Sequence, residues 1–439
     1  MFGSKYKIIL VLISIFTLML LAYVFYKSEI VLSGKKNDEY FKFYILLIIF
    51  LVINNLFLFF SEKFKQNYIL CLFSILSIIY IIEIFISFNK KKFFNEINLE
   101  NNSNIFSPYE FYKNSNKKEF IPVVSPSNFL KKKNNEFYKE LFPLAGLSNK
   151  NTIFCNESNN VEFYFSDRHG FNNNDQLWEK NIDIVFIGDS FTQGVCVKRE
   201  DNISSIISKK TQKQILNLGY GGNGPLIEFA TLREYGFKFK PKKVFWFYFE
   251  GNDLEELFDE LNNPILKKYY NRRYYSQKIM NKQNKVDFKI LNILKQKEKD
   301  VEKISPDDSK FIEIIKLRNI RNLTKFNKKF LKKDKFSKII KNFEKIIFKS
   351  KVEVESWGGE LYFVYLPDYS RFINKDNTRF KKSYILEKIE KLGIKTIDID
   401  NLVFKKKNDP LSFFPNRKNN HYNKVGYYEI AKEIIKFIN

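Results

Sequence analysis

The chain has 439 residues, which is enough for more than one domain and for a large buried core. Lysine and arginine outnumber aspartate and glutamate by 74 to 49, and the net charge of +25 would ordinarily favour nucleic acid or an anionic membrane surface as a partner. The sequence carries no zinc-finger spacing, RNA-recognition signature or basic heptad region, so we exclude nucleic-acid binding. Lysine, asparagine, isoleucine and phenylalanine are abundant together along the chain, which indicates a coding bias rather than a basic binding face.

Three long apolar segments occupy the first 92 residues. They run from Ile8 to Tyr26, from Phe43 to Phe60 and from Tyr68 to Phe88. Each is near the ~20 residues that cross a bilayer as a helix. The first segment is not followed by the small-residue cleavage site of a signal peptide, and two further segments come after it. We therefore predict a membrane domain of three transmembrane helices at residues 1–92, in contact with membrane lipids.

Polar residues interrupt the second and third segments. Asn54 and Asn55 lie together in the second, where amide side chains commonly bond to a neighbouring helix. Glu83 lies near the end of the third. We expect its carboxylate to reach out of the membrane towards the lysines at 90–92 rather than to mark a transport path.

Lysines and cysteines give opposite predictions for the orientation of these helices. On one side lie Lys5, Lys7, Lys63 and Lys65, and on the other Lys27, Lys35, Lys36, Lys42, Lys90, Lys91 and Lys92. The positive-inside rule would make the larger group cytoplasmic, together with the C-terminal part of the chain. Outside the spans, however, only Cys155 and Cys196 remain, and a disulfide between them requires an oxidising compartment. Two unpaired buried thiols are the alternative. Because lysine is dense everywhere, we predict a multi-pass inner-membrane protein whose C-terminal domain faces the periplasm or the cell exterior.

The rest of the chain divides into a connecting segment and a folded domain. Residues 93–148 are polar and irregular, with Pro108, Pro122 and Pro126, and we predict a linker or membrane-proximal cap there. Residues 149–439 alternate short strands with helices. The predicted strands are a hairpin from Ile153 to Phe165 and single strands at Ile182 to Phe186, Gln214 to Leu218, Lys243 to Phe249, Leu361 to Leu366 and Thr396 to Ile399. This alternation predicts an α/β fold with a doubly wound parallel sheet.

A lysine-rich stretch at residues 254–350 is helix-prone and has no strand pattern, which predicts an insertion into the α/β domain. A solvated helical face is its simplest interpretation. A lid over the functional site, or a surface for an anionic polymer or for lipid headgroups, is the alternative.

The segment at 182–197, IDIVFIGDSFTQGVCV, holds the strongest functional signal. Its apolar, β-branched run stops abruptly at Gly188-Asp189-Ser190, which predicts a buried strand that ends in a tight turn. A serine in that turn would lie at the carboxyl end of a parallel strand, where substrates bind in such folds. The spacing differs from the nucleophile elbow of the α/β-hydrolases, because Thr192 stands where the second glycine belongs. A plain turn is the alternative interpretation.

An activated serine needs a base, and histidine is the usual one because its pKa lies near neutrality. The chain has only two histidines, His169 and His421. His421 lies in a loop directly before an amphipathic C-terminal helix, which places it at the edge of the sheet, and we predict it to be the base. We expect His169, in the loop ahead of the serine strand, to be an incidental loop residue.

Two turns have the composition of an oxyanion hole, which needs hydrogen-bond donors aimed at one oxygen. A glycine-rich turn from Asn217 to Pro225 follows one predicted strand and offers backbone N–H groups. The turn from Glu250 to Asp253 follows the aromatic strand and offers the amide of Asn252. Glycine-rich loops also hold phosphates, but the lysine and serine of a P-loop are absent from this one.

The serine turn, glycine turn, Gly251-Asn252-Asp253 and late histidine, in this order, resemble the GDSL or SGNH hydrolase superfamily from Ile182 to the C-terminus. The resemblance implies that Ser190 is the nucleophile and His421 the base. It also implies that Gly222 and Asn252 join the Ser190 N–H as oxyanion donors. Hydrolysis or transfer of acyl esters, commonly acetyl groups on carbohydrates, is the implied chemistry, with no metal or cofactor.

A second likeness and one departure qualify this resemblance. The stretch from Ser166 to Asn172, with Trp178, resembles a membrane-anchored bacterial subgroup of the superfamily. The superfamily's acid, usually three residues before the histidine and in some members two, is here replaced by Lys418 or Asn419. Asn419 is able to orient the imidazole but not to stabilise its charged form. A dyad without an acid, or an acid from elsewhere such as Asp409, is the alternative.

We therefore expect a membrane-anchored SGNH-like esterase or O-acyltransferase acting on an acylated carbohydrate or a lipid-linked glycan. The expected site comprises Ser190, His421, Gly222, Asn252 and Asn419. The other hypothesis is an inactive protein of the same fold that serves as a glycan-binding or scaffold protein at the membrane.

Overall fold

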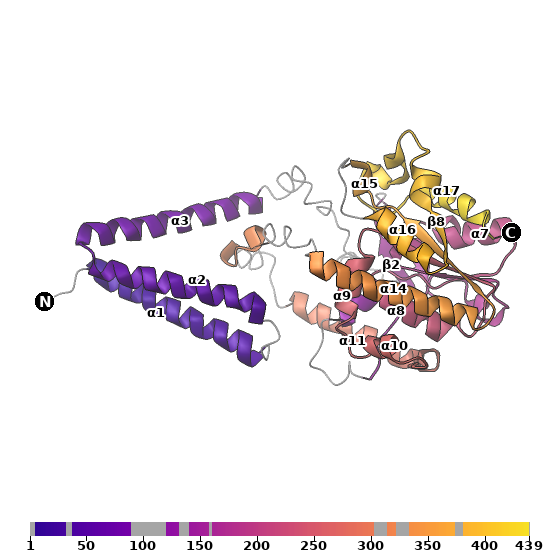
Figure 1. Cartoon of the computed structure of the whole chain (residues 1–439), viewed down its shortest axis with the longest axis horizontal. Helices are drawn as coiled ribbons and strands as arrows, with labels where there is room; N and C mark the ends of the chain where they lie inside the picture. The colour runs from indigo at the N-terminus through magenta and orange to yellow at the C-terminus, as the bar shows by residue number, and fades with distance from the viewer. Residues whose placement is uncertain are drawn as a thin grey trace. The chain divides into compact units, whose positions relative to one another are not determined.

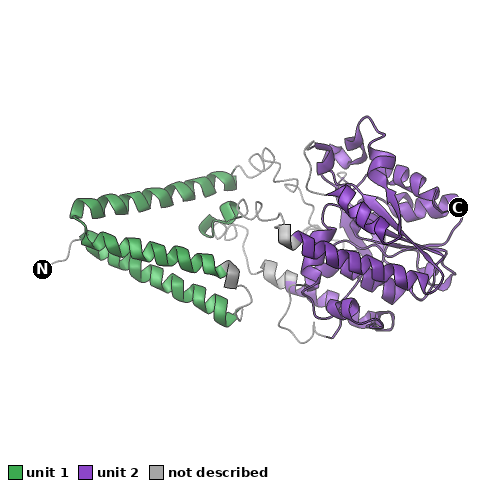
Figure 2. Ribbon diagram, viewed as in Figure 1, with its two compact units in different colours: residues 1–93, 306–328 green, residues 94–305, 329–439 purple. Residues whose placement is uncertain are grey.

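The computed structural model describes residues 5–31, 37–88, 120–130, 140–157, 160–302, 314–321, 333–373 and 381–438 (Figure 1). They form two compact units, coloured green and purple in Figure 2. Unit 1 comprises Met1–Phe93 and Pro306–Lys328, and unit 2 comprises Phe94–Ser305 and Lys329–Asn439.

Unit 1 contains three helices that are long and apolar enough to cross a membrane, as the sequence predicts. They are α1 (Lys5–Phe25), which continues as the π-helical turn η1 (Tyr26–Val31), α2 (Asn37–Leu56), which continues as η2 (Phe57–Phe59), and α3 (Glu62–Phe88). Large apolar side chains such as Phe16, Leu46 and Phe73 are exposed on them. Lipid would cover these apolar side chains. A helix is stable there because its backbone N–H and C=O groups bond to one another.

Polar side chains inside unit 1 bond to neighbouring backbone. Asn54 donates to the Leu10 carbonyl oxygen and to the Ser14 hydroxyl, both at 2.8 Å, which confirms its predicted role between helices. For Asn55 the prediction is wrong, because its amide donates to the Leu51 carbonyl oxygen of its own helix at 2.8 Å. The prediction for Glu83 is wrong, because its carboxylate is buried and accepts from the backbone N–H groups of Asn319 at 2.8 Å and Ile320 at 2.9 Å. A carboxylate at free N–H groups that begin a helical turn is a stable arrangement. The lysines at 90–92 lie outside the described residues.

Unit 2 is built on a five-stranded sheet in which all strands are parallel. The strands are β4 (Ile184–Ile187), β5 (Ile215–Asn217), β6 (Lys243–Phe249), β7 (Glu360–Leu366) and β8 (Lys395–Asp398), in the spatial order β5-β4-β6-β7-β8. The order reverses beside β4, so the carboxyl end of β4 is the point at which ligands bind in doubly wound folds. The predicted fold class is confirmed.

Alternating side chains of these strands enter two separate cores. Phe186 and Phe245 face helices α7 (Ile203–Thr211) and α17 (Lys424–Ile435). Val185 and Trp246 face the opposite side. The helices over that side include α8 (Pro225–Thr231), α14 (Lys333–Glu355) and α16 (Lys382–Lys391), as Figure 1 shows. Because successive side chains of a strand point to opposite faces, an unbroken apolar strand is covered by helices on both faces.

A second sheet of three strands precedes the first in the sequence. It changes the predicted domain boundaries. It contains β1 (Phe120–Pro122), β2 (Asn151–Cys155) and β3 (Glu162–Phe165), with β2 and β3 antiparallel as the predicted hairpin requires. β1 belongs to the stretch at 93–148 that we predicted to be a linker, and Phe142 and Leu144 of that stretch are buried in the core. The described parts of the stretch are therefore integral to unit 2. Pro108 lies outside the described residues.

The predicted insertion is helical, but much of it belongs to the core. Its helices α9 (Asp253–Glu260), α10 (Leu266–Asn271), α11 (Gln283–Glu302) and α14 contain no strand between them in the parts that the structure describes. Tyr269, Ile290 and Phe343 are fully buried under the sheet. Helix α14, the last helix before β7, exposes Lys338, Lys341 and Lys345, so these lysines form the solvated outer face that we expected.

Short helical turns complete unit 2. They are η3 (Pro126–Phe129), η5 (Asp175–Glu179), α6 (Ser190–Gln193), η6 (Arg199–Asp201), η7 (Leu232–Gly236), η8 (Ile279–Lys282), α15 (Ser370–Ile373), η10 (Asp400–Phe404), η11 (Pro410–Phe413) and η12 (Pro415–Arg417).

Candidate active site

Ser190 lies where the central strand β4 turns into α6. Asp189 caps this short helix, because its carboxylate accepts the Phe191 N–H at 2.9 Å. A Cβ atom on Gly188 would come within 2.1 Å of the Thr192 hydroxyl oxygen, so the turn requires glycine there. The serine therefore begins a helix at the carboxyl edge of the sheet, as the sequence predicts.

His421 reaches this turn from the loop before α17. The side chain of Asn423 caps α17 by accepting the N–H groups of Val425 and Gly426, each at 3.0 Å. The neighbouring Tyr422 is fully buried, and its hydroxyl donates to the Pro367 carbonyl oxygen. With the loop held from both sides, His421 Nε2 lies 2.8 Å from Ser190 Oγ. The structure thus brings together the two residues that the sequence predicts as base and nucleophile.

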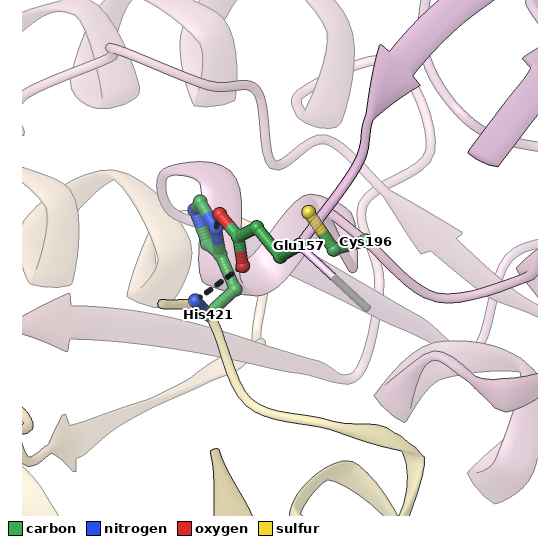
Figure 3. A group of neighbouring side chains, drawn as sticks. All are labelled: Glu157, Cys196 and His421. Carbon is green, nitrogen blue, oxygen red and sulfur yellow. Dashed lines mark hydrogen bonds and ion pairs between the residues drawn. The ribbon is translucent and has the colours of Figure 1, made fainter. Parts of the chain in front are cut away.

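A third residue, Glu157, completes the arrangement. Its Oε1 lies 2.7 Å from His421 Nδ1, and its Oε2 accepts the His421 backbone N–H at 2.7 Å, as Figure 3 shows. A carboxylate only accepts hydrogen bonds, so the imidazole proton lies on Nδ1 and Nε2 is left to accept the Ser190 hydroxyl. Carboxylate, imidazole and hydroxyl therefore form one continuous chain of hydrogen bonds.

The electrostatics of the site favour a charged imidazole. Burial of the ring opposes protonation, but the carboxylate of Glu157 outweighs burial, and Asp189 adds to its effect, so the pKa of His421 is raised above its ordinary 6.5. Burial also raises the pKa of Asp189 to about 6. The side chains of His421 and Glu157 are each 21% exposed, so their pair is screened from water without being sealed from it.

The two residues that the sequence offers for orienting the imidazole, Asn419 and Asp409, do not bond to it in the described part of the chain. The Nδ1 atom faces Glu157, and Asn419 makes no hydrogen bond to the ring among the described residues. Asp409 is paired with Arg417 instead. The prediction that Asn419 orients the imidazole is therefore wrong, and Glu157 takes that place. Glu157 escaped sequence reasoning because it precedes the serine and lies outside the stretch that resembles the superfamily, although it comes only two residues after Cys155.

Cys155 and Cys196 form a disulfide, with their Cα atoms 5.4 Å apart, as predicted. The bridge joins the end of β2, which leads into Glu157, to the loop that follows Ser190. It spans 41 residues, and loop-closure entropy for that length contributes about 4 kcal/mol to stability. The sulfur of Cys196 also lies beside Glu157 and His421, but a bridged cysteine offers no thiolate, so these three residues are not a zinc ligand set.

The predicted oxyanion donors follow the two strands that flank β4. Gly222 follows β5 and has a φ of 77°, a conformation that favours glycine. The adjacent Gly221 lies near Ser190, with its Cβ position 3.6 Å from the serine Cβ, but its N–H already donates to Gln193 at 2.8 Å. By contrast, the N–H groups of Gly222 and Ser190 make no hydrogen bond to any described residue. Both therefore remain available to a ligand.

Asn252 follows β6 and stands directly before the first residue of α9, without a side-chain bond to the N–H groups of that helix. One N–H of its amide donates to Glu256 Oε1 at 3.1 Å, which fixes the side chain and leaves the second N–H for another acceptor. Since β5 and β6 both pair with β4 in parallel, the turns that carry Gly222 and Asn252 leave the sheet at the same edge as Ser190.

His169 takes no part in this arrangement. Its ring is buried against Trp178, with ring centroids 4.5 Å apart, and burial lowers its pKa to about 4. The loop around it is organised by Asp167, which accepts the N–H groups of His169 and Phe171 and the indole N–H of Trp178, each at 2.9 Å. The loop from Ser166 to Asn172, which the sequence analysis singles out together with Trp178, thus has a structural role: its bonds to Asp167 fix its conformation.

No protein-family model and no curated protein matches the chain. Solved structures of esterases and of a lipolytic G-D-S-L protein are similar to it. An acetyl xylan esterase is 13% identical, with a TM-score of 0.34, over 59% of this chain and 100% of that one. A putative lipolytic protein of the G-D-S-L family from Desulfitobacterium hafniense is 14% identical, with a TM-score of 0.30, over 58% and 97%. An acetylxylan esterase from Geobacillus stearothermophilus is 12% identical, with a TM-score of 0.33, over 58% and 93%.

Proposed function

We propose that unit 2 is a serine esterase or O-acyltransferase that works through an acyl-Ser190 intermediate. The observation that carries the proposal is the chain of hydrogen bonds from Ser190 through His421 to Glu157, with distances of 2.8 Å and 2.7 Å. A hydroxyl bonded to an imidazole that a carboxylate orients is the arrangement that activates serine in acyl transfer.

In the first half of the proposed reaction, Ser190 Oγ attacks the ester carbonyl carbon while His421 Nε2 takes the hydroxyl proton. The carbonyl oxygen becomes negative, and the N–H groups of Ser190, Gly222 and Asn252 stabilise it. The bond from carbon to the leaving oxygen then breaks, and the imidazolium returns its proton to that oxygen. An alcohol leaves, and the acyl group stays on Ser190.

In the second half, a hydroxyl compound enters and His421 removes its proton as it attacks the acyl carbon. Water releases a free acid, whereas a sugar hydroxyl produces a new ester. Collapse of the second intermediate returns the proton to Ser190 Oγ. The residues of the site perform both outcomes by the same proton transfers, without a metal or cofactor.

The proposed substrate is an acyl ester, with acetyl as the first candidate, on a carbohydrate or lipid-linked glycan near the membrane. The motif resemblance motivates the ester and the three apolar helices of unit 1 motivate the membrane. The hypothesis of an inactive, glycan-binding protein arose from a missing acid, and the pairing of Glu157 with His421 removes that reason.

The oxyanion hole gives a direct test. We expect Asn252→Ala to lower kcat for an acetyl-ester probe by about 10²-fold to 10³-fold, because it removes one donor to the negative oxygen. KM should change much less, since the donor acts mainly in the transition state. Steady-state kinetics of the purified full chain measures both constants.

Asn262→Ala is the matched control, because Asn262 lies just beyond the other end of α9, is exposed and bonds only within that helix. It should leave both constants unchanged. A loss of kcat in the control equal to that in Asn252→Ala would show that the effect comes from the helix and not from the oxyanion hole.

We further propose that unit 1 anchors the protein in the inner membrane and that unit 2 faces the periplasm or cell exterior, where disulfides persist. In intact cells of a Cys71→Ser variant, a membrane-impermeant maleimide should then label Cys155 and Cys196 only after reduction. Replacing both with serine should lower the free energy of unfolding by about 4 kcal/mol.

Cys71 is removed because it is the free cysteine among the described residues. Labelling of both remaining cysteines without reductant, and only after the membrane has been opened, would contradict the proposed orientation and the bridge together.

A further inference from the structure

A polar cavity of about 320 Å³ lies beside the amino end of β5. The loop at 172–180, the Arg199 side chain and helix α7 surround it. Its lining is rich in amides and hydroxyls, including those of Asn174, Gln176 and Ser205. Its volume is at the lower end of the range for small-molecule sites.

The charge of this cavity is of one sign. Lys180, Arg199 and Lys209 line it, and no carboxylate does. Within the described part of the chain, neither lysine makes an ion pair. Three cations around one cavity repel one another, and an anion placed among them would relieve that repulsion.

Arg199 is the most informative of the three because it is half-buried without a carboxylate partner among the described residues. Its Nε donates to Asn172 Oδ1 at 2.9 Å, and its Nη2 donates to the Phe165 carbonyl oxygen. Both acceptors are neutral. Burial lowers the pKa of Arg199, which reflects the cost of holding this charge away from water. The neutral acceptors orient the guanidinium, and the carboxylates of Asp167 and Glu200, which do not bond to it, offset its charge less than burial opposes it.

We infer that this cavity binds an acidic sugar residue, either a uronate or a sugar phosphate, with the anionic group on Arg199, Lys180 and Lys209. The charged group explains the unpaired cations, since guanidinium and ammonium groups bind carboxylates and phosphates through charge-assisted hydrogen bonds. The amides and hydroxyls both donate and accept, which suits a ring that carries several hydroxyl groups.

The cavity is connected to the serine turn by side-chain contacts. Asn172 Nδ2 donates to the Gln193 carbonyl oxygen at 3.3 Å, and Gln193 Oε1 accepts the Gly221 N–H at 2.8 Å. A glycan held in the cavity would therefore contact the same framework that carries Ser190. The binding itself does not depend on the proposed chemistry, and a chain without esterase activity would show it equally.

Saturation-transfer NMR titrations of the full chain in detergent would test the inference with three probes: glucuronate, glucose 6-phosphate and glucose. The wild type should bind one or both of the acidic sugars saturably and at least tenfold more tightly than glucose. The tighter of the two acids identifies the carboxylate or the phosphate as the natural group. Ser190→Ala should bind them like the wild type, which separates this result from any failure of the esterase proposal.

The decisive variant is Lys180→Ala with Lys209→Ala, because both lysines are exposed and their loss leaves the core intact. We expect about tenfold weaker binding of the acidic sugars, equivalent to ~1.4 kcal/mol. Its matched control is Lys213→Ala with Lys242→Ala, which removes the same charge from exposed positions outside the cavity. Unchanged affinity in the first variant, an equal loss in the control, or equal binding of glucose and the acids by the wild type would each overturn the inference.

Discussion

Ser190→Ala is expected to lower kcat for an acetyl-ester probe by about 10⁶-fold, close to complete loss, and His421→Ala by a similar factor. The reason is that each variant stops the same proton transfer, since the two side chains are 2.8 Å apart and neither performs the step alone. Purified full-length variants assayed at high enzyme concentration would measure the residual rate.

The double variant tests whether the two residues act as one unit. Its rate should be no lower than that of either single variant, because the second substitution removes nothing that still functions. His169→Phe is the control for histidine, since His169 packs against Trp178 and touches no reacting atom. Substantial activity in Ser190→Ala or in His421→Ala would remove that residue from the mechanism.

Glu157→Gln should lower kcat by about 10³-fold to 10⁴-fold, as the corresponding change does in other serine hydrolases. The amide keeps much of the shape of the carboxylate. It no longer fixes the proton on His421 Nδ1, and it no longer stabilises the imidazolium that forms when Ser190 attacks.

The same variant should shift the pH dependence of kcat/KM. The base works only as neutral imidazole, so wild-type activity should fall as the pH drops through the pKa of His421, which lies above 6.5 because of Glu157. In Glu157→Gln the main cause of that increase is gone, while burial still lowers the pKa. The acidic limb should therefore move to lower pH even though the rate is lower throughout.

Two further variants separate this role of Glu157 from a general effect of charge. Glu162→Gln removes the same charge from β3 of the same hairpin and should leave the rate and the acidic limb unchanged. Asn419→Asp should not raise the rate, because His421 Nδ1 is already bonded to Glu157. An increase with Asn419→Asp, together with an unchanged limb in Glu157→Gln, would reassign the acid to position 419.

The sheet was predictable because its signal is local. The strand at Lys243 to Phe249 is apolar and aromatic after its first residue, and the structure has it at the same residues. A strand that is buried on both faces leaves such a run in the sequence wherever it occurs. By contrast, the short strand β1 at Phe120–Pro122 exists because it pairs with β2, about 30 residues away, and no local pattern marks it.

The site was predictable to the extent that its residues are rare or motif-bound. His421 is one of two histidines, and Ser190 follows a distinctive strand end. Glutamate is common in this chain, so nothing in composition distinguishes Glu157 from the rest. The information was nevertheless present in Cys155, because a bridge from Cys155 to the loop after Ser190 brings the residues next to it to the nucleophile.

The polar residues in the apolar helices also differ in how far their contacts could be predicted from the sequence. The amide of Asn54 bonds to the next helix of the same unit, and a sequence with three adjacent spans indicates that partner. Glu83 bonds to residues 319 and 320, more than 200 positions later, inside the stretch predicted to be an insertion of the α/β domain. Contacts at that separation depend on the path of the whole chain and have no local signal.

Labelling with a fluorophosphonate tests the central claim most directly, because the reagent forms a stable adduct only with a serine that an adjacent base activates. The full chain should react with one equivalent, and mass spectrometry of its peptides should find the adduct on Ser190. His421→Ala and Glu157→Gln should react much more slowly. A folded wild-type protein that does not react, or an adduct on a serine other than Ser190, would contradict the account.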